Sequence, residues 1–359
     1  MSVARLCEEL QAAGQEVQVL TTTANGVSEL DVIPGKLYHV DGVAVIYFKR
    51  ITKDHSHFSP SLLGYLWKHG ASYEVVHIHS WWNLVALGAA LICYIKKFPF
   101  VVSPRGMFSD YSVSGRRSLM KRMIHALLNK PVLKHAHFHA TTRREMDQVL
   151  ELFPHASVQV AFNIVDLPAQ KVYDRLEEGV YKLVFISRID PKKGLPLLFQ
   201  ALQQVSFPFR LSVIGGGDPE YMMQLKQQTV QLGISENVTW SGVLQGDEKF
   251  DALGRHDLMV LPSYDENFGN VVVEALSAGV PVLLSEQVGL SSVVSEHQLG
   301  WVCSTEITSI REGLETSFRE AAVRKNITRE APAWVRKVFS GSHLTGNYFA
   351  IYKRCITHA

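Results

Sequence analysis

The chain has 359 residues, of which 47% are apolar, and a formal net charge of +2. A single core stops growing at roughly 250–300 residues, so a chain of this length predicts two domains. The near-neutral charge and the lack of any reader motif disfavour nucleic-acid binding.

The cysteines and the longest apolar run indicate the cellular compartment of the protein. The four cysteines are scattered without C-x-x-C spacing, which indicates a reducing compartment rather than a disulfide framework or a metal cluster. The longest apolar run, residues 84–95, is shorter than the roughly 20 residues of a spanning helix, and no secretory signal is recognised. The prediction is a cytoplasmic protein with at most peripheral contact at the inner face of the plasma membrane.

The first domain, residues 1–165, is predicted from alternating strand and helix patterns. It opens with an amphipathic helix over residues 2–13 and a strand over 17–22. In a doubly wound domain such a helix follows a central strand and a glycine-rich turn, and neither is found here. Two interpretations stay open: the start lies at an internal Met of a longer protein, or the first sheet lacks a middle strand. The remaining elements are predicted at residues 36–49, 62–69, 75–80, 84–95, 99–103, 116–129, 136–142, 143–150 and 157–163.

A polar, turn-rich linker at residues 166–179 is followed by a second alternating domain over 180–335. Residues 336–359 are predicted to form a separate helical segment at the end of the chain. This order predicts an α/β fold of two Rossmann-like doubly wound domains with parallel sheets, facing a cleft. Strands and helices of the second domain are predicted at residues 181–187, 195–205, 210–215, 219–232, 237–242, 247–255, 259–261, 270–278, 280–285 and 301–304, with helices from 310 onward.

Two carboxylates stand out where a buried strand runs into a helix, in PSYDENFGNVVVEALSAGVPV (residues 262–282). Glu266 is predicted in the loop and Glu274 in the second turn of the helix, at the strand ends where open α/β sheets bind ligands. The alternative is that Glu266 caps the helix and Glu274 faces solvent.

Two further loops belong to the same predicted edge. Residues 188–194, RIDPKKG, place Arg188 and a lysine before a helix N-terminus, which suits a diphosphate, although solvated loop cations would give the same pattern. Glycines at 215–217 permit close approach to a ligand or simply a turn. In the first domain, HIHSWWN (residues 77–83) puts His77 and His79 on one side of a strand end, where packed histidines are an equal alternative to a functional pair.

The segment 96–134 carries nine basic residues and one acid, Asp110. Its helix, predicted at 116–129, has an apolar side opposite its charges. It could lie on an anionic membrane surface, or it could be a solvated outer face of the first sheet.

Taken together, these motifs resemble the group 1, or family 4, retaining glycosyltransferases of the GT-B fold. The resemblance is strongest over residues 181–285, in the stretches FISRIDPKKGLPLLFQAL, VIGGGDPEY, VTWSGVL and PSYDENFGNVVVEALSAGVPVLLS. It implies a nucleotide-diphosphate sugar, UDP- or GDP-linked, on the second domain and a glycan or lipid-linked acceptor on the first. It also implies a role in cell-surface polysaccharide or lipopolysaccharide biosynthesis, and a terminal helix at 336–359 that crosses back to the first domain.

The resemblance also implies residue roles. Arg188 and Lys193 would hold the donor diphosphate, and Glu266 the hydroxyls of the transferred sugar. Glu274 would bind the ribose hydroxyls. The remaining donor contacts would come from Phe268, Gly269 and Asn270, which follow Glu266, and from Gly215 and Gly217 in the glycine loop. Acceptor-side candidates are His79, Arg105 and Trp81; Arg105 stands near a place where many relatives have a histidine, so a contact with the acceptor or the phosphates is expected. No D-x-D sequence occurs, so no metal and no cofactor is predicted.

Three rival functions are considered. A sugar-nucleotide binding subunit without activity would fit the missing strand and glycine turn. A nucleotide-sugar epimerase of similar fold would need no acceptor. A nicotinamide dehydrogenase is the weakest rival, because the glycines at 215–217 lack the G-x-G-x-x-G pattern and its acidic partner.

Overall fold

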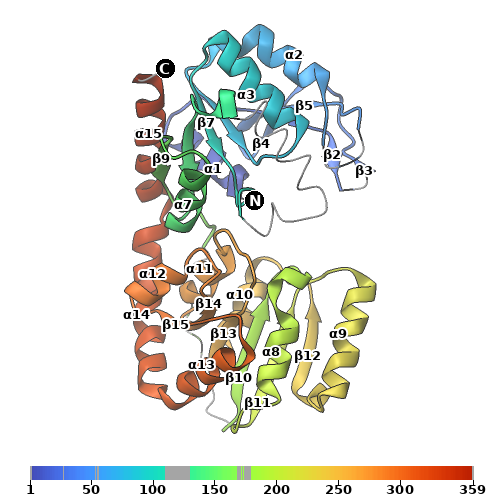
Figure 1. The fold of residues 1–359 in the computed structure, drawn as a ribbon, viewed down its shortest axis with the longest axis vertical. Helices are drawn as coiled ribbons and strands as arrows, with labels where there is room; N and C mark the ends of the chain where they lie inside the picture. The colour runs from blue at the N-terminus through green and yellow to red at the C-terminus, as the bar shows by residue number, and fades with distance from the viewer. Residues whose placement is uncertain are drawn as a thin grey trace. The chain divides into compact units, whose positions relative to one another are not determined.

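The structure is a computed structural model. It describes residues 2–26, 28–52, 54, 56–109, 130–167, 171, 173 and 179–357. The chain divides into two compact units (Figure 1). The first consists of Met1–Ile164 with Gly341–Ala359, and the second of Val165–Ser340. The predicted basic helix at 116–129 lies outside the described residues.

The first unit contains two main sheets. A three-stranded sheet has the order β1-β5-β4, and a four-stranded parallel sheet has the order β6-β7-β8-β9. β1 and β5 are parallel, and β4 pairs with β5 as an antiparallel hairpin. The strands are β1 (Gln18–Thr22), β4 (Leu37–Val40), β5 (Val43–Phe48), β6 (Val76–His79), β7 (Phe100–Ser103), β8 (His137–Ala140) and β9 (Ser157–Val160), with a short pair β2 (Ala24–Asn25) and β3 (Ser28–Glu29).

Local sequence signals explain the helices of this unit. Ser59 caps α2 and Pro60 occupies its first turn, while the Asn83 side chain accepts a hydrogen bond from Ala86 N at 2.8 Å to start α3. α3 ends where Lys97 adopts a left-handed conformation. The helices are α1 (Ser2–Ala12), α2 (Pro60–His69), η1 (Gly70–Ser72), α3 (Leu84–Lys96), α6 (Lys130–Leu133), α7 (Arg143–Leu152) and α15 (Gly341–Thr357).

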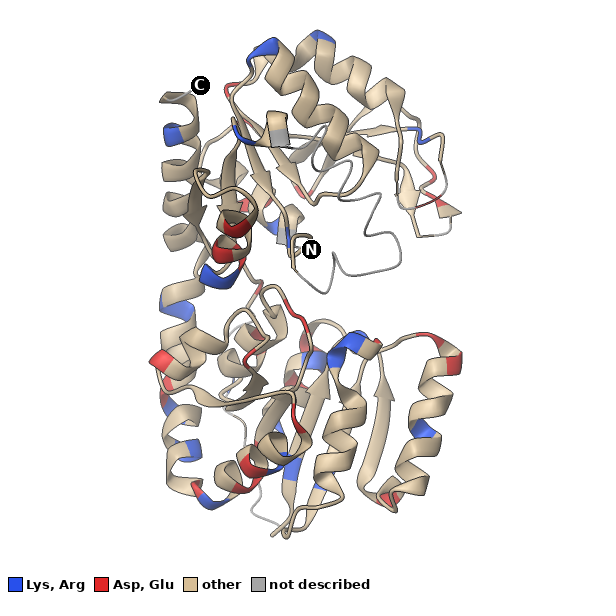
Figure 2. Cartoon of the chain, viewed as in Figure 1, with Lys and Arg blue, Asp and Glu red and all other residues tan. Residues whose placement is uncertain are grey.

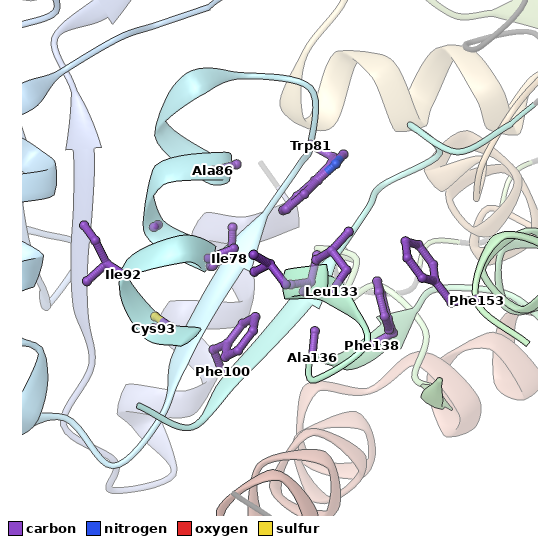
Figure 3. Packing of buried hydrophobic residues seen from close by; sticks show 14 of the residues in the cluster. Ile78, Trp81, Ala86, Ile92, Cys93, Phe100, Leu133, Ala136, Phe138 and Phe153 are labelled. Atoms are coloured by element: carbon purple, nitrogen blue, oxygen red, sulfur yellow. The ribbon is translucent and has the colours of Figure 1, made fainter. Parts of the chain in front are cut away.

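Aromatic side chains fill the core around the four-stranded sheet (Figure 3). Phe138 of β8 stacks on Phe153 with ring centroids 5.4 Å apart, and both lie beside Phe108. α15 contacts α1, β7 and β8. Burying several large aromatic rings in one cluster supplies much of the hydrophobic stabilisation of this unit.

The second unit contains one continuous parallel sheet of six strands, in the order β12-β11-β10-β13-β14-β15. Every residue of β13 and β14 is buried, as expected for parallel strands covered on both faces. The strand order reverses between β10 and β13, which is where such sheets bind ligands. The strands are β10 (Tyr181–Ile186), β11 (Phe209–Ile214), β12 (Val238–Gly242), β13 (Leu258–Leu261), β14 (Val282–Ser285) and β15 (Gly300–Cys303).

Helices cover this sheet, with α8 and α9 seen beside it in Figure 1. The stretch predicted as a linker is described only in part: Lys171 and Tyr173 both contact Asp251 of α10. The helices are η3 (Pro191–Lys193), α8 (Leu195–Leu202), α9 (Pro219–Gln231), η4 (Ser235–Asn237), α10 (Gly246–Gly254), α11 (Asn270–Ser277), α12 (Ser291–Glu296), α13 (Ile307–Arg319) and α14 (Ala321–Phe339).

The α/β fold with two parallel-sheet domains is confirmed. Predicted elements mostly agree with the observed ones within a few residues, and the strand expected from residue 237 begins at Val238, after the turn of η4. No helix in the described part of the chain is long and apolar enough to cross a membrane.

Candidate active site

Arg188 and its loop lie at the carboxyl end of β10. The Arg188 side chain is 71% exposed, and its guanidinium lies 3.9 Å from a carboxylate oxygen of Asp190. Asp190 in turn accepts a hydrogen bond from Lys192 N at 3.1 Å and so starts the turn of η3. Figure 2 shows the basic residues where the chain passes from β10 to α8. Arg188 is therefore a cation available to an anionic ligand.

Gly194 joins this loop to the one that follows β13. It adopts φ 73°, and a Cβ there would lie 2.1 Å from the carbonyl oxygen of Pro262. Only glycine permits that approach. Tyr264 N also donates to Lys192 O at 2.8 Å. The two loops are thus fixed side by side at the edge of the sheet.

Lys193 and Glu266 form an ion pair as a result. The Lys193 Nζ donates to Glu266 Oε2, and the two side chains are 8% and 21% exposed. A charge this buried requires a partner, because desolvating an unpaired ion is costly. The backbone of Glu266 is also fixed by hydrogen bonds. Its N–H donates to Gln287 O at 3.2 Å, and its carbonyl oxygen accepts from Gly289 N at 2.8 Å.

The helix-cap interpretation of Glu266 is wrong. α11 begins after Gly269, which has φ 88° and provides no side-chain cap. Gly269 is close to its neighbours, since a Cβ would meet Val272 at 3.2 Å and Glu266 Cγ at 3.5 Å. Asn270 is the first residue of α11. Phe268 is only 3% exposed and its ring lies 6.2 Å from that of Phe339, so its backbone rather than its side chain is available at the loop.

Glu274 does not face solvent. Its side chain is 13% exposed, and Oε1 accepts a hydrogen bond from Lys249 Nζ at 2.8 Å. Lys249 comes from α10, a helix whose sequence carries no motif of this site, so sequence reasoning missed it. The only signal would have been a basic residue in a helix predicted beside α11.

Gly215 and Gly217 serve close packing within the sheet edge. A Cβ at Gly215, with φ 146°, would lie 1.9 Å from Ser187 O, and one at Gly217 would lie 2.1 Å from Ile189 O. Ile189 and Gly217 also form a bridge. These glycines bring the β11 loop against the Arg188 loop.

In the first unit, buried polar groups meet at the carboxyl ends of β6, β7 and β8. A hydrogen-bonded row links Tyr352, His77, Ser103 and His139 to the carbonyl of Ala161, with separations of 2.9, 2.6, 2.6 and 2.8 Å. A carbonyl only accepts, so His139 donates through Nε2 and accepts from Ser103 at Nδ1. By the same logic His77 donates to Ser103 and accepts from Tyr352.

These histidines are held neutral. Burial, with Arg105 as the second cause, lowers the pKa of His139 from 6.5 to about 3. Burial first, then Arg105 and His139, also lowers the pKa of His79. The pKa of His77 falls for the same leading reason, and its ring lies 3.9 Å from that of His79. Neutral rings are needed for the row, because a protonated His139 would turn an N–H toward the Ser103 hydrogen.

Arg105 is fixed on this edge. Its guanidinium contacts His79 Nδ1 at 3.3 Å and donates to Asn163. Arg105, Ser80 and Trp82 all adopt positive φ angles of 58–71°, a conformation that L-residues adopt at a cost and that clusters at functional sites.

Glu145 anchors the strained turn and was missed by sequence reasoning. It is 1% exposed, accepts from Gly106 N at 2.7 Å, and accepts from both N and Oγ1 of Thr141 at 2.7 and 2.8 Å. Trp81, predicted at the acceptor side, is 2% exposed and packs in the aromatic core, so its side chain is not presented to a ligand. Within the described ranges, no group of three or more His, Cys, Asp or Glu is placed to hold a metal ion.

Two family models match consecutive parts of the chain, up to residue 334. The first, Glycosyltransferase Family 4, matches residues 1–168, and the second, Glycosyl transferases group 1, matches residues 169–334. The chain therefore belongs to the group 1, or family 4, glycosyltransferases.

Among curated relatives, an uncharacterized glycosyltransferase of Methanocaldococcus jannaschii is 24% identical, covering 97% of this chain and 92% of its own. N-acetyl-alpha-D-glucosaminyl L-malate synthase of Bacillus anthracis is 22% identical over 78% of this chain and 74% of its own. D-inositol 3-phosphate glycosyltransferase of Rhodococcus erythropolis is 27% identical, but the match spans only 50% of this chain and 42% of the relative.

Solved structures share the fold. Sucrose-phosphate synthase of Thermosynechococcus elongatus has a TM-score of 0.77 at 16% identity, covering 99% of this chain and 93% of its own. The Anabaena protein HepE, solved with UDP and glucose, has a TM-score of 0.74 at 17% identity, covering 98% and 96%. The GT-B fold is thereby confirmed.

Proposed function

We propose that this glycosyltransferase is a metal-independent, retaining hexosyltransferase that uses a UDP- or GDP-linked sugar. Its acceptor would be a glycan or a lipid-linked sugar in the assembly of a cell-surface polysaccharide or lipopolysaccharide, at the cytoplasmic side. The observation that carries the proposal is the buried Lys193–Glu266 pair beside the exposed Arg188, where the order of the second sheet reverses.

The cations would serve the leaving group. When the bond between the anomeric carbon and the diphosphate oxygen breaks, negative charge grows on the diphosphate. Arg188 and Lys193 would donate hydrogen bonds to it and lower the barrier, since fixed charges aimed at developing charge are the largest catalytic term in many enzymes. The acceptor oxygen forms the new bond to the same carbon, and its proton passes to the departing diphosphate, so no protein base is required.

The carboxylates would recognise hydroxyl groups. Glu266 is fixed by its backbone and by Lys193, so its free oxygen would accept from a hydroxyl of the transferred sugar. Glu274, fixed by Lys249, would accept from the ribose hydroxyls. A hydrolase with two carboxylates would instead place them on opposite sides of one bond. Here both come from one loop and the helix that follows it, which favours recognition.

For the acceptor, the candidates are Arg105 and His79, which contact each other at the strained edge of the first unit. Neutral His79 could donate or accept, and Arg105 could contact a phosphate or hydroxyl. Trp81 would not contact the acceptor; its side chain would support this edge by packing in the core.

Membrane contact is proposed for the start of the basic segment. Tyr94 and Ile95 of α3 are 41% and 53% exposed, next to Lys96 and Lys97. Lys96 also lies 4.4 Å from the ring of Trp67, which is 46% exposed. Exposed aromatic and aliphatic side chains beside lysines suit the surface of an anionic bilayer. Co-sedimentation with vesicles of phosphatidylglycerol should exceed that with phosphatidylcholine, and Ile95→Ser should weaken it while Ile33→Ser should not.

The test of the proposal is sugar transfer by Arg188→Ala and Glu274→Ala. We expect kcat/KM to fall at least about a hundredfold for Arg188→Ala, since removing a fixed donor to developing charge costs about 3 kcal/mol. Glu274→Ala should mainly raise KM. Arg255→Ala and Glu248→Ala, exposed changes on or next to α10, are the matched controls. Wild-type rates in both test variants would refute the assignment.

A binding subunit without activity is the second candidate. The observation that favours it is the division of the first unit into two separate sheets, which leaves its middle open. Tight binding of nucleotide sugar in a thermal-shift assay, with neither transfer nor hydrolysis, would identify it. An epimerase would be recognised by a changed sugar in the absence of any acceptor.

A further inference from the structure

Arg105 is a cation without a negatively charged partner in the first unit. Its guanidinium donates to Asn163 and contacts His79 Nδ1 at 3.3 Å, and both partners are uncharged. Its Nε is buried and makes no hydrogen bond. In the part of the chain that the structure describes, no ion pair joins Arg105 to a carboxylate. The positive charge is therefore not neutralised by these residues.

Two other buried cations show what Arg105 lacks. The Arg50 side chain is 1% exposed, and its Nε lies 2.6 Å from Glu29 Oε1. Lys193, at 8% exposure, forms its ion pair with Glu266. A charge taken out of water is costly unless a counter-ion and hydrogen bonds compensate it. Arg105 is half-buried and has hydrogen bonds but no counter-ion, which an anionic ligand would supply.

The rings around Arg105 do not supply negative charge. Burial, with Arg105 as the second cause, lowers the pKa of His79 and of His139, so both rings are neutral at pH 7. Burial raises the pKa of Tyr348 to about 12, although Arg105 opposes the shift, so the phenol keeps its proton. Of these four side chains, only Arg105 is charged at neutral pH.

Glu145 lies beside the same turn, but its carboxylate is engaged by neighbouring residues. Its oxygens accept from Gly106 N at 2.7 Å and from N and Oγ1 of Thr141 at 2.7 and 2.8 Å. Glu145 also belongs to the first turn of α7, which begins with Arg143. A helix N-terminus attracts anions, and a basic residue in its first turn opposes the helix dipole. The turn that carries Arg105 therefore adjoins a second positively charged feature.

The backbone at Arg105 adds to the cost of this side chain. Arg105 has φ 58°, in the left-handed region that glycine adopts without steric cost. A glycine here would remove both the strained conformation and the charge without a counter-ion. Residues held in such conformations cluster at binding and catalytic sites. A ligand therefore explains the arginine better than the stability of the turn does.

We propose that Arg105 binds a phosphate group on the acceptor. The guanidinium presents its donors as a planar fork that matches phosphate oxygens. A phosphate monoester carries about −1.5 to −2 charges at pH 7, more than a carboxylate, which suits an edge with Arg105, Arg143 and a helix N-terminus. The inference rests on the proposed function, since it names the chemical class of the acceptor. Two sources share this chemistry: a soluble sugar phosphate and a sugar attached to a lipid through phosphate.

Binding of phosphate esters to the full chain tests the proposal without an assay of sugar transfer. Glucose 6-phosphate is the soluble probe and farnesyl phosphate the lipid probe, with glucose and farnesol as uncharged controls. A ligand that binds only the folded protein raises the melting temperature. At least one ester should raise it in the wild type, while its uncharged counterpart should not. The ester that binds more tightly identifies the source.

Arg188→Ala separates this site from the second unit. It removes the exposed cation there, which is a competing place for phosphate. The rise in melting temperature caused by the ester should be the same in Arg188→Ala as in the wild type, because Arg105 and Arg188 belong to different units.

Arg105→Gly is the main variant. It should raise the apparent Kd for the bound ester at least about tenfold, since the fork of donors is lost. The melting temperature of the free protein should stay the same or rise, because charge and strain are both removed, whereas a merely structural arginine would give a fall. Lys97→Gly, which removes another basic residue with positive φ from the first unit, is the matched control for glucose 6-phosphate and should leave its Kd unchanged.

Arg105→Lys is the second variant and keeps the proposal testable where the glycine variant does not fold. It retains the charge but not the planar fork, so the apparent Kd for the ester should rise at least about threefold. Its melting temperature should stay close to that of the wild type.

Several results would overturn the proposal. One is the same apparent Kd in the wild type, Arg105→Gly and Arg105→Lys. Another is stabilisation that Arg188→Ala abolishes and Arg105→Gly leaves intact, which would assign the phosphate to the second unit. Stronger stabilisation by succinate than by either ester would replace the phosphate by a carboxylate. No stabilisation by either ester would refute the site outright.

The proposed function fails in a different way. UDP and GDP should stabilise Arg105→Gly as much as the wild type, because their site is proposed in the second unit. Binding of an ester that depends on Arg105, in a protein that turns over no sugar nucleotide, would keep the phosphate site and refute sugar transfer. Sugar transfer to an acceptor without phosphate, at a rate independent of Arg105, would refute the phosphate site alone.

Discussion

The two units are built from the same β/α repeat, yet only the second has a closed sheet. Its six strands pair without a break, and its glycines press neighbouring loops together at the ligand edge. The first unit instead has two sheets with partly buried inner edges, and its polar groups are fixed by one hydrogen-bonded row and one buried carboxylate. Sheet continuity positions the candidate site of the second unit, whereas side-chain hydrogen bonds position the polar groups of the first unit.

Glu145→Ala should have the largest effect among the substitutions that test this difference between the two units. It removes the acceptor of three buried hydrogen bonds, from Gly106 N and from N and Oγ1 of Thr141, at about 1–3 kcal/mol each, so the unfolding free energy should fall by at least about 3 kcal/mol. Urea denaturation measures the loss, and hydrogen exchange should locate it in the first unit. Asp147→Ala, an exposed acid on the same helix, should cost less than about 0.5 kcal/mol. A loss spread equally over both units would contradict the contrast.

Gly215→Ala tests the second unit in the same way. Its Cβ would meet Ser187 O and its φ is strained for any other residue, so we expect a loss of about 2 kcal/mol confined to the second unit. KM for the donor should rise too, since the Arg188 loop must shift. Gly64→Ala, in an α-helix with nothing within 4 Å of the new Cβ, is the control and should be neutral or stabilising. If Gly215→Ala changed neither the stability nor the donor KM, the β11 loop and the Arg188 loop would not be tightly packed.

Acid should weaken the first unit through His139. Its folded pKa of about 3 lies below the 6.5 of the unfolded chain, so between these values the unfolded state binds more protons and stability falls as the pH drops. At pH 5.5 this one group should cost about 1 kcal/mol relative to neutral pH. His139→Gln, which can still donate to Ala161 and accept from Ser103, should flatten the pH dependence, while His297→Gln should not. If the unfolding free energy of His139→Gln depended on pH as steeply as that of the wild type, the neutral hydrogen-bonded row would be contradicted.

The smallest expected effect is that of Lys249→Met. Losing the partner of Glu274 should raise donor KM about fivefold, or about 1 kcal/mol, with little change in kcat, because the ribose does not react. Lys226→Met on α9 is the matched control. A fall in kcat without a change in KM would place Glu274 in the chemistry instead.

Sequence reasoning predicted the position of the loops at the edge of the second sheet better than the contacts within the first unit. Arg188, Glu266 and Glu274 follow strands of a recognisable alternation, so the topology of a parallel sheet brings their loops to one edge. Lys249 and Glu145 were missed because their partners come from elements whose contact depends on how helices pack. The row from Tyr352 to Ala161 joins residues that lie far apart in the chain, and no local pattern reports such a contact.

By itself, the sequence determined the repeat of strands and helices, the division into two domains and the family, because hydrophobic periodicity and turn residues act over a few positions. Only the tertiary structure decided that Glu266 pairs with Lys193 and that Trp81 is buried in the core. Those outcomes depend on which surfaces meet, and packing between distant segments settles that.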